Sequence, residues 1–244
     1  MTIIDTPVSP AASSPLGPLP DGASETTAWL WDALGDVWAD FERRLAGIPV
    51  VRRMEDGTIT LDEYHELLLN LRQQVIEGGR WIALTASSMS IELSPVRSLL
   101  IRHAAEEHMD YRMLEHDFTS TGGDIAVMTS QPKNIGSEAF SAFMFREAGQ
   151  PDPVHLFGAM FIIEGLGACK AARWARGIQR SLGLDESQVR FLAYHGLNDD
   201  SHFDKLRGIL TNPLVDRPLA ERLVRTAKVV ARLYALQLEE LGNV

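Results

Sequence analysis

The sequence of 244 residues predicts one all-α domain of about seven helices. Apolar residues recur at helical spacing along most of the chain after residue 24, whereas no long segment alternates apolar and polar residues with a period of two. Helix start signals also recur: a capping side chain is followed by proline, or by an acidic or amide residue three positions later.

The N-terminal segment differs from the rest of the chain. Residues 1–24 are rich in proline, serine, alanine and glycine and offer few apolar side chains to bury. This composition predicts a disordered or loosely attached arm. Residues 25–244 are expected to form the helical domain, which begins with a helix over residues 26–48.

The second predicted helix has the clearest start signal. Thr60 and Glu63 have the spacing of a capping box, and apolar residues then recur at helical spacing from Leu61 to Val75 and beyond. The Gly78-Gly79 pair inside this helix predicts a kink or a close crossing with another helix.

Five further helices follow from similar signals. Ser94-Pro95 provides an N-cap and a first helical position, and the helix that it begins is expected to end before Gly122-Gly123. The five predicted helices cover residues 94–118, 135–148, 153–180, 185–210 and 218–240.

Composition excludes several classes of function. The net charge is −10, and no cluster of lysine and arginine could grip a phosphate backbone or an anionic membrane. No apolar run approaches the roughly 20 residues that span a bilayer, and no secretory signal is visible. Cys169 is the single cysteine, which excludes an intramolecular disulfide and favours a cytoplasmic location. We therefore expect a small-molecule substrate, with no nucleic acid and no membrane.

The residues from Tyr194 to His202 carry the strongest chemical signal. His195, Asp199 and His202 are spaced i, i+4 and i+7, which places them on one face of a helix. Imidazole and carboxylate together suit iron that reacts with oxygen. The alternative is a solvated helix face or a surface ion pair.

A second candidate ligand is Glu164, which lies in an apolar stretch beside Gly165 and Gly167. A buried carboxylate is costly unless it is paired or binds a metal. The glycines indicate close packing or room for a ligand. The alternative is a core glutamate paired with an arginine such as Arg173.

The third contribution comes from His103, Glu107 and Asp110, again at i, i+4 and i+7. Helical bundles build dimetal carboxylate sites from such side chains on several facing helices. Glu77 is a more remote candidate carboxylate. The pattern leaves open a rival stripe formed by Glu106, Met113 and His116.

Taken together, Glu164 and the downstream motif His195-x3-Asp199-x2-His202 resemble the haem-oxygenase-like diiron oxidase and oxygenase superfamily. Thiaminase II and pyrroloquinoline-quinone synthase share its scaffold. The resemblance covers nearly all of the chain after the arm, and it implies a haem-oxygenase-like helical bundle.

The resemblance implies metal ligands residue by residue. Glu164, His195, Asp199 and His202 match the ligands of the second half of the family pattern. In the first half, Glu107 matches a glutamate. The family has histidine three residues later, where this chain has Asp110, so His103 or His108 is the alternative nitrogen donor. This departure leaves open whether the chain holds one iron or two.

By this resemblance we expect a non-haem iron oxidoreductase that uses O2 to oxidise a small molecule such as an amino acid, an amine or a fatty acid. The expected cofactor is Fe(II)/Fe(III), with two ions per chain, and the expected assembly is a homodimer. The alternatives are a cofactor-free, quinone-synthase-like oxidase and a thiaminase-II-like binding protein or hydrolase. The second of these needs a nucleophilic cysteine, for which the sequence offers only Cys169.

Overall fold

The computed structural model describes residues 14–244, except for the side chains of residues 198–202. Within this part of the chain all regular structure is helical and no β-strand occurs, which confirms the predicted fold class. The main helices are α1 (Glu25–Leu45), α2 (Pro49–Asp56), α3 (Leu61–Ser87), α4 (Ser94–Glu107), α5 (Tyr111–Ser120), α6 (Ile125–Ser130), α7 (Ile135–Ala148), α8 (Phe157–Leu166), α9 (Ala172–Leu182), α10 (Arg190–Leu210) and α11 (Arg217–Glu239).

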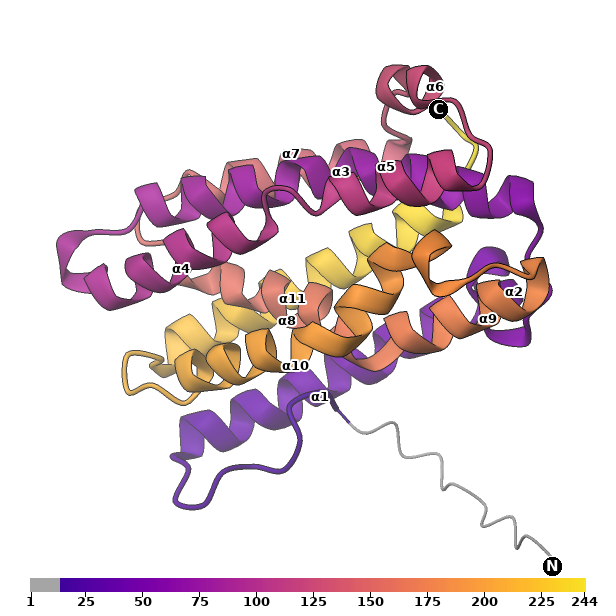
Figure 1. Ribbon diagram of the computed structural model, residues 1–244. Helices are drawn as coiled ribbons and strands as arrows, with labels where there is room; N and C mark the ends of the chain where they lie inside the picture. The colour runs from indigo at the N-terminus through magenta and orange to yellow at the C-terminus, as the bar shows by residue number, and fades with distance from the viewer. Residues whose placement is uncertain (1–13) are drawn as a thin grey trace, which may run out of the picture.

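The helices pack in layers around one core (Figure 1). Helix α3 lies beside α4, α5 and α7 on one side of the molecule, and α1, α9 and α10 lie on the other. Helices α8 and α11 run between these two groups, and α8 is buried along nearly its whole length. This arrangement buries the apolar faces of the outer helices against a central pair.

The predicted start of α3 is confirmed at the level of single hydrogen bonds. The backbone N–H of Thr60 donates to the Glu63 carboxylate at 3.0 Å, and the backbone N–H of Glu63 donates to Thr60 Oγ1 at 3.3 Å. Both halves of the capping box are therefore present. The close crossing expected at the glycine pair occurs at Gly79, where a Cβ would lie 2.6 Å from His108 Cβ, whereas a Cβ on Gly78 would meet no atom within 4 Å. Only glycine allows α3 and the end of α4 to approach so closely.

The helix predicted over residues 94–118 is divided in two, which corrects the sequence-based boundary. Helix α4 ends at Glu107, a turn follows, and α5 begins at Tyr111. In the turn the N–H of Asp110 donates to the carbonyl of Glu107 at 3.2 Å, a tight i to i+3 bond in place of the helical pattern. Breaks of this kind, together with the short helices α2 and α6, give more helices in the described chain than the seven expected.

The helix predicted over residues 153–180 contains an irregular turn. A short 3-10 helix, η2 (Val154–Leu156), begins it, and a π-helical segment, η3 (Gly167–Ala171), separates α8 from α9. Single π-turns within α-helices are frequent at functional sites. Here the π-turn begins three residues after Glu164.

The run from Val154 to Leu182 is also long and apolar enough to be compared with a membrane span. It has 29 residues, its most apolar 18-residue window has a mean hydropathy of 1.4, and 78% of that window is buried inside the fold. Burial of this extent is typical of a helix in the core of a helical domain.

Part of the predicted N-terminal arm lies against the helices. Leu16 is buried, and the Arg207 side chain on α10 donates to the carbonyl oxygens of Pro15 at 2.8 Å and Leu16 at 3.0 Å. Residues 14–17 are therefore held against the domain at this point. Residues 1–13 lie outside the described residues.

Candidate metal centre

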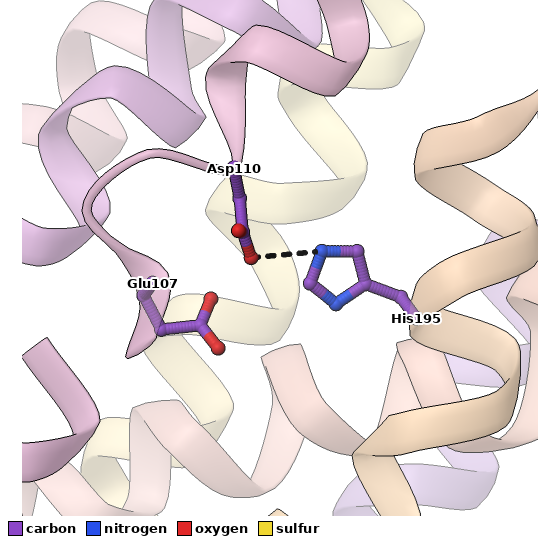
Figure 2. Close-up of side chains that lie close together, drawn as sticks. All are labelled: Glu107, Asp110 and His195. Carbon is purple, nitrogen blue, oxygen red and sulfur yellow. Dashed lines mark ion pairs between the residues drawn. The ribbon is translucent and has the colours of Figure 1, made fainter. Parts of the chain in front are cut away.

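Three predicted ligand residues meet between the α4–α5 turn and α10. Donor atoms of Glu107, Asp110 and His195 all lie within 4.8 Å of one another. Figure 2 shows the two carboxylates approaching from one side and the imidazole from the other, and His195 Nε2 lies 3.4 Å from Asp110 Oδ2. One imidazole and two carboxylates form a donor set that suits iron.

A second pair adjoins this group. His103 Nε2 on α4 lies 3.1 Å from Glu164 Oε1 on α8, and both side chains are about nine-tenths buried, at 7% and 10% exposed. His103, Glu107, Glu164 and His195 line one cavity. The suggested partner of Glu164, Arg173, instead pairs with Glu55 at 3.3 Å, so the pair between Glu164 and Arg173 does not form.

The electrostatics of the cluster fit a cation. The pKa of Glu107 is raised to about 7, mainly by burial and in addition by the nearby carboxylates of Glu164 and Asp110, against the opposing effect of His195 and His103. Several carboxylates held together in a buried space repel one another unless protons or a cation neutralise them. The residues present therefore fit a divalent metal ion in both donor type and charge.

Two of the remaining predicted ligands have side chains that the structure does not describe, and a third candidate, His108, lies away from the centre. Asp199 and His202 follow His195 on α10, but their side chains lie outside the described residues. His108, the alternative nitrogen donor, is exposed, and its Cα and Cβ pack against Gly79. Asp110, and not His108, is therefore the residue that the turn brings to the centre.

The rival stripe and the remote carboxylate have other roles. Glu106 is exposed and pairs with Lys205 of α10 at 3.2 Å, and His116 is exposed as well. Glu77 pairs with Lys133 at 2.8 Å and accepts a hydrogen bond from Ser141 at 2.5 Å. None of these side chains lines the cavity that holds Glu107 and His195.

The position of α10 depends on a residue that sequence reasoning missed. The carboxylate of Asp117, buried in α5, accepts the backbone N–H groups of Arg190 and Phe191, each at 3.0 Å. It satisfies two donors at the start of α10, five residues before His195. No sequence signal marks this cap, because 73 residues separate Asp117 from Arg190.

Gly196 brings α10 close to the centre from the other side. A Cβ at this position would lie 2.6 Å from the backbone nitrogen of Ala172 in α9. The glycine therefore allows the backbone that carries His195 to pack directly against the helix that follows η3.

Gly196→Ala is expected to lower the stability of the protein by about 1–3 kcal/mol and to weaken metal binding, because α10 has to move away from α9. Gly208→Ala is the matched control on the same helix, since a Cβ there meets no atom within 4 Å. Thermal unfolding and Fe(II) titration of both variants test this. Equal behaviour of the two variants would show that the close approach at Gly196 does not position the site.

The cavity extends from the candidate ligands into the apolar core. Its volume is about 100 Å³, and its walls come mainly from α3, α8, α10 and α11. Cys169 is exposed and does not line it. The wall residues that the sequence did not single out include Leu67, Leu71, Gln74, Trp81, Ile82, Met160, Trp174, Phe191 and Tyr234.

Comparison with known proteins places the chain in a family. The sequence profile described as "Iron-containing redox enzyme" matches residues 66–235, more than two thirds of the chain. The chain belongs to the iron-containing redox enzyme family. All of the candidate ligands lie within the matched residues, and this family membership confirms the resemblance inferred from the sequence motifs. No curated protein sequence matches the chain.

Solved structures share the fold at low identity. A domain of unknown function with a haem oxygenase-like fold from Shewanella denitrificans is 19% identical, with a TM-score of 0.79 over 85% of this chain and 89% of its own. A TenA homologue from Pseudomonas syringae is 13% identical, with a TM-score of 0.70 over 93% and 98%. Haem oxygenase-1 from Synechocystis, solved with haem, is 16% identical, with a TM-score of 0.60 over 90% and 94%. These likenesses show that this member of the iron-containing redox enzyme family has the haem-oxygenase-like fold.

Proposed function

We propose that the protein is a non-haem iron oxidase or oxygenase that uses O2 to oxidise a small molecule. The observation that carries the proposal is the largely buried group of Glu107, Asp110 and His195, which adjoins an apolar cavity in a member of the iron-containing redox enzyme family. Bound iron would supply the reaction with O2 that ordinary side chains cannot perform.

The arrangement of donors supports two metal positions. Glu107, Asp110 and His195 would hold one ion, and the neighbouring His103 and Glu164 would contribute to a second. The spacing of Asp199 and His202 along α10 suggests that these residues complete the second site. A single-iron centre is the alternative, since Asp110 replaces the histidine of the family pattern.

The chain's own residues would hold the ions and shape the substrate site. Glu107 and Glu164 supply negative charge in a buried space, where electrostatic attraction to a cation is strong. The apolar walls exclude bulk water, which protects a reactive centre from side reactions. We further propose the cytoplasm as its location and a homodimer as its assembly.

A thiaminase-II-like function draws support only from the shared fold of TenA homologues. Such a hydrolase would need the cysteine nucleophile identified above, but Cys169 is exposed and lies outside the cavity wall. The geometry therefore favours the iron-dependent reaction.

Anaerobic loading with Fe(II), followed by admission of O2, tests the proposal. We expect close to two Fe(II) per chain and O2 uptake in proportion to the bound iron; about one per chain would indicate the single-iron centre. Protein that retains no iron after desalting and takes up no O2 would contradict the proposal. It would then favour the cofactor-free alternative.

A further inference from the structure

The side chain of Gln74 places an amide in a largely apolar cavity wall. Gln74 belongs to the middle of α3 and lines the same cavity as Glu107 and His195. Most of its neighbours there are aliphatic or aromatic, among them Leu71, Val75, Trp81, Met160, Ile163 and Phe191. An amide in such surroundings is useful only if it has hydrogen-bond partners.

One end of this amide is engaged by a buried side chain. Gln237 on α11, which is fully buried, donates from Nε2 to Gln74 Oε1 at 3.0 Å. Ser137 Oγ in turn lies 3.3 Å from Gln237 Oε1 and 2.8 Å from Asn70 Oδ1. The Gln237 carbonyl accepts from the side-chain amide of Asn134 at 2.8 Å.

This network fixes how the amide of Gln74 is oriented. Buried polar networks are costly unless every member is satisfied, and when satisfied they hold their side chains in one arrangement. With Oε1 committed to Gln237, Nε2 is the group of Gln74 that can donate, and no described residue accepts a hydrogen bond from it. An occupant of the cavity with an oxygen acceptor would supply the partner.

The charges around the cavity restrict the occupant further. Among the described residues that line it there is no lysine or arginine, so an anionic group would find no side-chain counterion. Lys205 lines a separate space of about 20 Å³ and pairs with Glu106 at 3.2 Å. Once cations neutralise the carboxylates, an ammonium group would have no counterion either. A neutral polar group is the one that this wall can bind without an unpaired charge.

The size of the cavity limits the occupant as well. Its volume of about 100 Å³ is smaller than the cavity of about 150 Å³ that takes a benzene ring. The space suits a molecule with few heavy atoms, one end of which is apolar.

We propose that Gln74 binds the substrate and determines its specificity, and that the substrate is a small, apolar molecule with one neutral oxygen acceptor such as a ketone, aldehyde or alcohol. The inference rests on the proposed function only in taking this cavity as the substrate site. Gln74 Nε2 donates to the substrate oxygen, while the aromatic and aliphatic wall covers the rest of the molecule.

Trp81 and Trp174, which line the cavity, allow binding to be measured by tryptophan fluorescence. We would titrate pentan-2-one, pentan-1-ol, pentanoate and pentylamine into anaerobic Fe(II)-loaded protein. The two neutral molecules should bind at least about tenfold more tightly than the two ions. Tighter binding of pentanoate or pentylamine than of the neutral molecules would overturn the proposed substrate class.

The role of Gln74 is tested with variants in the metal-free and the Fe(II)-loaded protein. Gln74→Leu should weaken binding of pentan-2-one about five- to tenfold, the effect of losing one hydrogen bond. Gln150→Leu, at an exposed glutamine outside the cavity, is the control and should change nothing. Because Gln74→Leu also leaves Gln237 without its acceptor, Gln74→Glu serves as a second variant that keeps an acceptor for Gln237.

Gln74→Glu should fold with the network intact, lose affinity for pentan-2-one and gain affinity for pentylamine. If neither variant alters binding of pentan-2-one, the proposed role of Gln74 is wrong. A loss that occurs in metal-free protein as well shows that the Gln74 contact does not depend on iron. Failure of the iron-dependent function would instead appear as absent Fe(II) binding. The unchanged protein would then still bind pentan-2-one more tightly than Gln74→Leu does.

Discussion

His195→Ala should lower the affinity of the protein for Fe(II) by at least about 100-fold, because it removes the imidazole donor from the group that Glu107 and Asp110 complete. The variant should still fold, since His195 lies at the wall of a cavity that can admit water in its place. Competition titration with a chelator, monitored by bound iron, measures the change.

His65→Ala is the matched control for the loss of a histidine. His65 lies on α3 with Nε2 3.0 Å from Thr121 Oγ1, and it does not line the cavity. Its replacement should leave Fe(II) affinity unchanged within about twofold. Retention of normal iron affinity by His195→Ala would remove this histidine from the metal centre and with it the main support for the proposed site.

Glu107→Gln should have opposite effects on the metal-free and the metal-bound protein. The pKa of Glu107 is raised to about 7 from its usual value of about 4.5, first by burial and then by the carboxylate of Glu164. The folded state therefore holds this proton more tightly than the unfolded chain does. Metal-free protein has the full contribution of this group below pH 4.5 and loses it as the pH rises through about 7.

Replacing this carboxylate with a neutral amide should consequently stabilise the metal-free protein at pH 8 by about 1–3 kcal/mol, with little gain at pH 5. The same change should weaken Fe(II) binding by about 100-fold or more, since a ligand has been removed. Thermal unfolding at the two pH values, with and without Fe(II), measures both effects.

Glu221→Gln is the control for the loss of a carboxylate. Glu221 is exposed on α11, pairs with Arg217 at 3.0 Å and does not line the cavity, so its replacement should change metal-free stability by less than about 1 kcal/mol and leave iron affinity intact. Destabilisation of metal-free protein at pH 8 by Glu107→Gln would indicate that this carboxylate has a structural partner in place of a bound cation.

The two effects expected of Glu107→Gln, a gain in metal-free stability and a loss of iron affinity, are typical of a residue kept for function at a cost in stability. Glu164, buried in the otherwise apolar helix α8, is a second example, since it crowds another carboxylate beside Glu107. The π-turn from Gly167 to Ala171 follows directly and departs from regular helix in the same region. The irregular and electrostatically strained parts of the fold thus gather around one cavity.

The fold class was predictable because helix signals are local. The capping box at Thr60 and Glu63 and the helical recurrence of apolar residues depend only on neighbours a few positions away. The break after Glu107 was not predictable, since the residues from His108 to Asp110 include neither glycine nor proline. Close contact with Gly79 of α3 accompanies that break, and such a contact leaves no local signal.

The candidate site was partly predictable for a related reason. Carboxylates and imidazoles at helical spacing reveal Glu107, Glu164 and His195 as chemically unusual within apolar or repeated patterns. Asp117 and Gln74 were missed, because their roles arise from partners 73 and 163 residues away. Distinguishing Asp110 from His108 likewise required the turn between α4 and α5.

The central claim is that iron binds where the α4–α5 turn faces α10, and its location can be measured directly. Crystals soaked anaerobically with Fe(II) would be measured on both sides of the iron absorption edge, so that anomalous difference density marks each ion. The account predicts a peak among the side chains of Glu107, Asp110 and His195, with any second peak next to His103 and Glu164. Peaks only at the surface, or none beside these residues, would contradict it.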